Sequence, residues 1–150
     1  MSSPPLTIIR FDEDRTVLSD GGSPPVVLNV AAVHIATRLF RHDPPTPGEI
    51  EQAIDWVEDA LAITGLKQTE RGDLVIDSPM MFEQLQLRDV GGRMTRDELE
   101  ARFQRLASIS LGHPRAQDDP PTGPMAAALL LILRECMHHL GYSGLMPDRR

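Results

Sequence analysis

The sequence predicts an α+β fold in a single domain, with about four helices packed on a small β-hairpin or short sheet. Two segments, Thr46-Pro47-Gly48-Glu49 and Thr95-Arg96-Asp97-Glu98, place a threonine three residues before a glutamate, the pattern of a capping box at a helix start. Short apolar runs such as Leu74-Val75-Ile76 lie between turn-forming residues, as strands do. The 150 residues, 41% hydrophobic and 25% charged, suit one soluble domain with a single core.

The N-terminal part begins with a predicted β-hairpin over residues 6–18, whose polar turn is Asp12-Glu13-Asp14-Arg15. The following segment, 26–41, holds β-branched residues that are typical of a strand. A serine in the N-cap position and a proline in the first helical position favour a helix instead. The apolar residues at helical spacing support the helix as well: Leu28, Ala32, Ile35 and Leu39. We therefore predict a helix over 26–41.

Three more helices are predicted from start and stop signals. The first runs from about 47 to 64 and ends at Gly65, the second opens at the Thr95 capping box, and the last spans 124–140 and ends at Gly141. Residues 80–90 fit neither a helix nor a strand clearly. Residues 1–5 and 145–150 are expected to be frayed ends of the single domain 1–150.

Charge and apolar patterning exclude several classes of partner. The 15 basic and 22 acidic residues give a net charge of -7, which disfavours binding to nucleic acid phosphates. The longest apolar run, 125–133, is about half the length of a membrane-spanning helix, and the start lacks the pattern of a signal peptide. Lone Cys136 cannot form an intramolecular disulfide. We expect a cytoplasmic protein, of bacterial type from its arginine-rich and lysine-poor composition, with no nucleic acid or membrane partner.

The best polar cluster lies on the last predicted helix, where Glu135 and His139 are four residues apart and so share a face. In a functional interpretation, Glu135 orients His139 as a general base, or Cys136 and His139 supply two metal ligands. In the alternative, Glu135 and His139 form a half-exposed ion pair near the helix end, and Cys136 is a small core residue. A metal needs at least about three ligands, so we expect no metal centre and no cofactor.

A second pair of carboxylates, Asp73 and Asp77, flanks the predicted strand 74–76. On a strand both would lie on one face, as two magnesium ligands do, yet aspartates that bound a strand are also ordinary turn formers. The turn-forming role is the one we expect.

The helix over 47–64 carries an apolar stripe that Trp56 and Ile63 widen to one side. A tryptophan at the margin of such a stripe belongs either to the edge of the core or to an interface, where tryptophan is enriched. We take Trp56 and Ile63 as candidates for a homodimer interface.

These observations favour a non-catalytic binding or regulatory module that acts through its helix faces, as a homo-oligomer or bound to a protein partner. The alternative is a small metal-dependent or general acid/base enzyme that uses Glu135 and His139. A pocket that brings His139 to another acid from elsewhere in the chain would favour the enzyme. A flat apolar patch around Trp56 would favour the binding module.

Overall fold

The computed structural model describes residues 6–86 and 92–148, and its sheet is larger than the sequence predicted. Within these residues the model confirms the α+β class but forms a six-stranded mixed sheet in the order β3-β2-β1-β4-β6-β5. The inner strands β1, β4 and β6 run parallel, and the outer ones are antiparallel to their neighbours. The strands are β1 Thr7–Phe11, β2 Thr16–Ser19, β3 Val26–Leu28, β4 Arg71–Ile76, β5 Met94–Thr95 and β6 Tyr142–Pro147.

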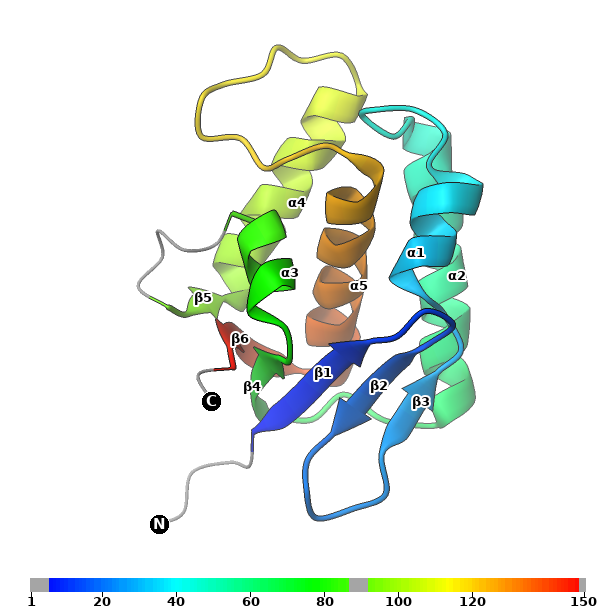
Figure 1. The fold of residues 1–150 in the computed structure, drawn as a ribbon, viewed down its shortest axis with the longest axis vertical. Helices are drawn as coiled ribbons and strands as arrows, with labels where there is room; N and C mark the ends of the chain where they lie inside the picture. Colours follow the sequence, from blue (N-terminus) through cyan, green and yellow to red (C-terminus); the bar gives the residue numbers. More distant parts are fainter. Residues whose placement is uncertain (1–5, 87–91, 149–150) are drawn as a thin grey trace.

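The helices pack around a central one, α5, which lies between α4 and α2 beside the sheet (Figure 1). Their bounds are α1 Ala32–His34, continued by the π-helical turn η1 Ile35–Leu39, α2 Pro47–Thr64, α3 Pro79–Gln84, α4 Arg96–Ser110 and α5 Pro124–Leu140. Residues 129–133 in α5 are all buried, and α2, α4, α1, η1 and β6 all contact this helix. A helix that is apolar on all sides is stable only in such a position.

Local hydrogen bonds account for the helices whose bounds were predicted well. Both capping boxes form: Thr46 Oγ1 accepts a hydrogen bond from the amide of Glu49 at 3.1 Å, and the Glu49 carboxylate accepts one from the amide of Thr46 at 2.9 Å. Thr95 and Glu98 make the same two bonds at the start of α4. Gly65 and Gly141 end their helices in the left-handed conformation, with φ of 71° and 90°.

The helix predicted over 26–41 is wrong in its first part. Val26–Leu28 instead forms β3, antiparallel to β2, with Thr16 opposite Leu28 and Leu18 opposite Val26. Helical structure begins only at Ala32. Strand β2 pairs along its edge with these β-branched residues, and this pairing across a turn outweighs the helix-start signal at Ser23.

The C-terminal prediction also needs correction, because residues 145–147 of the tail expected to fray belong to the sheet, while 1–5 and 149–150 lie outside the described residues. Tyr142–Pro147 forms β6 between β4 and β5, with Leu145 fully buried opposite Leu74. Of the ambiguous segment 80–90, the part to Gln84 belongs to α3, and residues 87–90 lie outside the described residues. None of the described helices is both long and apolar enough to cross a membrane.

Candidate functional site

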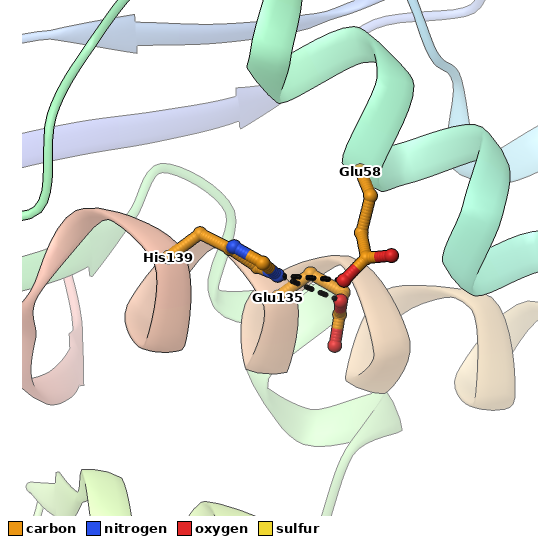
Figure 2. A group of neighbouring side chains, drawn as sticks. All are labelled: Glu58, Glu135 and His139. Carbon is orange, nitrogen blue, oxygen red and sulfur yellow. Dashed lines mark hydrogen bonds and ion pairs between the residues drawn. The ribbon is translucent and has the colours of Figure 1, made fainter.

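Two helices bring together a histidine and two carboxylates. Nε2 of His139 on α5 lies 2.9 Å from Oε2 of Glu58 on α2 and 3.3 Å from Oε1 of Glu135, one turn earlier on α5 (Figure 2). The predicted pair of Glu135 and His139 is thus close in space. Glu58 is the acid from elsewhere in the chain, and it was not singled out by the sequence analysis.

Glu135 is the unusual member of this cluster because only 1 % of its side chain is exposed. Its Oε2 accepts a hydrogen bond from Nη1 of Arg134 at 2.6 Å, whereas its Oε1 is buried and has no hydrogen-bond partner among the described residues. Arg134 also forms a bidentate pair with Glu100 of α4 at 2.7 and 3.1 Å. The hydrogen bonds from Arg134 hold the pKa of Glu100 below its usual value.

Cys136 belongs to the core and not to this cluster. The side chain is fully buried among apolar residues, and burial raises the pKa of its thiol to about 12. Among the described residues, the acidic, histidine and cysteine side chains that converge closely enough to hold a metal ion are Glu58, Glu135 and His139. The Cys136 and His139 ligand pair is therefore not formed, and the core role considered for Cys136 is confirmed.

The two aspartates around 74–76 are not gathered into a shared site either. Asp73 lies within β4 and accepts two hydrogen bonds from the guanidinium of Arg93, at 2.8 and 2.9 Å. Asp77 follows the end of β4 and is exposed, and its amide donates to the carbonyl of Ile9 in β1. Through these two bonds to Arg93, Asp73 holds the segment before β5 against the sheet, so its role is structural.

Trp56 and Ile63 differ in their burial although they lie on one side of α2. Trp56 is half-buried against the core and lines a shallow groove of about 290 Å³ with Leu39 and three polar residues, Gln52, Asp55 and Asp59. Ile63, seven residues later, is 84 % exposed. The surface around Trp56 is therefore mixed in polarity and not a flat apolar patch.

Sequence reasoning missed a cavity of about 620 Å³ at the end of α5, where β4, β6 and α4 begin. Arg71 is fixed at its wall: Nε donates to the carbonyl of Leu140 at 2.7 Å and Nη2 to the carbonyl of Lys67 at 2.9 Å. A cation in this position is favoured by the partial negative charge at the end of α5. The cavity is lined by Gln68, Thr69, Glu70, Arg71, Arg96, Gly141 and Ser143.

The charges in this cavity are two guanidinium groups, of Arg71 and Arg96, against the one carboxylate of Glu70. Both hydrogen bonds of the Arg71 guanidinium go to backbone carbonyls, so neither of them brings a carboxylate that would neutralise its charge. Arg96 is exposed and forms no ion pair within the described part of the chain. The lining comes from three separate parts of the chain, 68–71, Arg96 and 141–143, so only the fold could bring them together.

Comparison with known proteins finds similarity in structure alone. No protein-family model matches the chain, and no curated protein matches its sequence. The structure is similar to solved structures of the Ppx/GppA group. For an Aquifex aeolicus PPX-GPPA enzyme, the TM-score is 0.68 at 13% identity, with 98% of this chain and 54% of the other covered. For an Aquifex aeolicus Ppx/GppA phosphatase in its type II variant, the TM-score is 0.69 at 12% identity, again with 98% of this chain and 54% of the other covered.

A third structure, an exopolyphosphatase from Cytophaga hutchinsonii, gives a TM-score of 0.59 at 10% identity and covers 99% of this chain. The chain spans about half the length of these proteins, since 54% of each is covered. At such low identity the likeness establishes the fold alone.

Proposed function

We propose that this chain is a phosphatase-related domain that binds a phosphate-bearing anion in the cavity lined by Arg71 and Arg96. The observation that carries the proposal is the excess of guanidinium over carboxylate groups in that cavity. The structurally similar proteins are described as a phosphatase and an exopolyphosphatase, which supports phosphate as the ligand chemistry. This proposal retains the binding role that the sequence analysis favoured, but it places the binding in a cavity and not on the helix faces.

The cavity offers the donors that a phosphate group requires. Arginine presents paired N–H donors that match phosphate oxygens, as Arg96 can here. Nε and Nη2 of Arg71 already donate to Leu140 and Lys67, which fixes the guanidinium and leaves Nη1 for a ligand. Hydroxyl groups of Thr69 and Ser143 also line the cavity, although Ser143 donates to the carbonyl of Arg71 at 3.0 Å. Because arginine and hydroxyl donors bind phosphate without reacting with it, we assign binding to this cavity, and hydrolysis is one of the outcomes of the test below.

The test is isothermal titration with inorganic phosphate and with tripolyphosphate at constant ionic strength, since salt screens such contacts. Arg96→Gln removes a charge-assisted contact and is expected to weaken binding about tenfold. Glu70→Gln removes the opposing carboxylate and is expected to strengthen binding. Arg38→Gln, which removes an exposed arginine of η1 that does not line the cavity, is the matched control and should bind like the parent.

Two results would contradict the phosphate proposal. One is the lack of binding of either anion by the parent protein, and the other is equal weakening by Arg96→Gln and Arg38→Gln. Release of phosphate from tripolyphosphate, measured in the same samples, would instead support the enzyme alternative.

A second candidate function, self-association through α2, is favoured by the exposure of Ile63. An isoleucine that is 84 % exposed, about two turns along α2 from half-buried Trp56, leaves apolar area that a second copy of the chain could cover. Ile63→Glu is expected to convert a dimer to a monomer in sedimentation velocity, whereas Leu111→Glu, at another exposed apolar position on the loop after α4, is expected to leave it intact. A parent protein that stays monomeric at high concentration would refute this candidate.

A further inference from the structure

We propose that Glu58, Glu135 and His139 form a binding site for one divalent transition metal ion, with zinc as the ion to test. The three side chains offer one nitrogen and two carboxylate oxygens, all within 4.8 Å of one another. An imidazole with carboxylates is a ligand set that zinc accepts, with open positions left for water. The prediction of no metal centre counted only ligands close in sequence, and so it could not include Glu58 from α2.

The hydrogen bonding of the cluster leaves one acceptor unsatisfied. Nε2 of His139 can carry a single hydrogen, but two carboxylate oxygens face it, and the hydrogen bond goes to Glu58 at 2.9 Å. Oε1 of Glu135 therefore stays buried without a donor, which is costly for a carboxylate. A cation placed among the three groups would bind Oε1 together with the other two ligands.

The distances already suit such an ion. Zinc bonds of about 2.0–2.1 Å separate neighbouring ligand atoms of a tetrahedron by about 3.3 Å. Nε2 of His139 lies 2.9 Å from Glu58 Oε2 and 3.3 Å from Glu135 Oε1, so both carboxylates stand near that spacing. The two carboxylate oxygens also lie within 4.8 Å of each other.

Two further features fit a metal site. Arg134 holds Oε2 of Glu135 at 2.6 Å and Glu100 in turn holds Arg134, an outer layer of hydrogen bonds that orients the buried ligand. The other two ligands are open to solvent, with 37 % of the His139 side chain and 41 % of the Glu58 side chain exposed, so an ion has a path of entry.

The experiment uses the full chain after dialysis against a chelator. Adding about 100 μM ZnCl₂ is expected to raise the melting temperature by about 5 °C, and calorimetric titration is expected to give one site. His139→Gln and Glu58→Gln each remove one ligand and should abolish the shift. Glu135 is left unchanged because a substitution at a buried, ion-paired side chain could unfold the protein.

His113→Gln is the matched control, since His113 is an exposed histidine outside the cluster, and it should keep the full zinc-induced shift. Cobalt(II) gives an independent readout: the parent should show visible d–d absorption that His139→Gln loses. The proposal is overturned if zinc leaves the parent melting temperature unchanged. It is also overturned if His139→Gln keeps the shift, or if His113→Gln loses it, because zinc would then bind elsewhere on the surface.

Discussion

Gly141→Ala is expected to lower the free energy of unfolding by at least about 3 kcal/mol and to leave much of the protein insoluble. Gly141 ends α5 with a φ of 90°, a conformation that L-residues rarely adopt. The larger part of the effect comes from the backbone that crosses it: a Cβ on Gly141 would overlap the carbonyl oxygen of Thr69. This segment is held there by hydrogen bonds from Thr69 N to Leu140 O and from Arg71 N to Gly141 O.

Gly65→Ala is the matched control for that measurement. Gly65 also ends a helix in the left-handed region, with a φ of 71°, but nothing lies within 4 Å of a Cβ built on it. The conformational cost alone should lower the free energy of unfolding by about 1 kcal/mol in urea denaturation. If the two variants lose the same stability, the close approach of Thr69 to the end of α5 is wrong.

Arg134→Gln is the second substitution expected to have a large effect, with a loss of about 3 kcal/mol in urea denaturation in the presence of a chelator. Arg134 pairs with buried Glu135 on one side and with Glu100 on the other, and its guanidinium lies 4.5 Å from the ring centroid of Phe103. Removing the arginine leaves the Glu135 carboxylate buried without its main cation, and an uncompensated buried charge is among the most destabilising changes.

The double variant Arg134→Gln/Glu135→Gln separates this cause from a simple loss of packing. Once the buried carboxylate is neutral, the missing cation matters less, so the double variant should be more stable than Arg134→Gln alone. Additive losses from the two substitutions would contradict the view that Arg134 stabilises the fold through Glu135.

The helices whose ends are set by local hydrogen bonds are also those that sequence analysis placed well. The capping box of Thr46 and Glu49 and the left-handed Gly65 bound α2 within a few residues of each end, so nothing distant is needed to recognise them. The apolar run in α5 likewise showed that this helix is buried. Strand β3 was missed because its pairing with β2 depends on a partner about ten residues away, and local cap signals pointed the other way.

The candidate sites also differ in whether they depend on residues that are near or distant in the sequence. Glu135 and His139 could be paired from their spacing on one helix, because residues four apart share a face. Glu58 could not be added, since it reaches them from α2 across 81 positions of sequence. The cavity of Arg71 and Arg96 left no signal at all, since it exists only where the start of β4 passes the end of α5.

The sequence by itself determined the α+β class, the capped ends of α2 and α4, and the buried character of α5, because hydrogen bonds and apolar periodicity within one segment specify them. Only the tertiary structure decided that Tyr142–Pro147 is an inner strand and that Glu58 joins Glu135 and His139. The physical reason is that strand pairing and side-chain clusters draw their free energy from groups distant in the chain. One segment of the chain contains only one of the two partners in each such interaction.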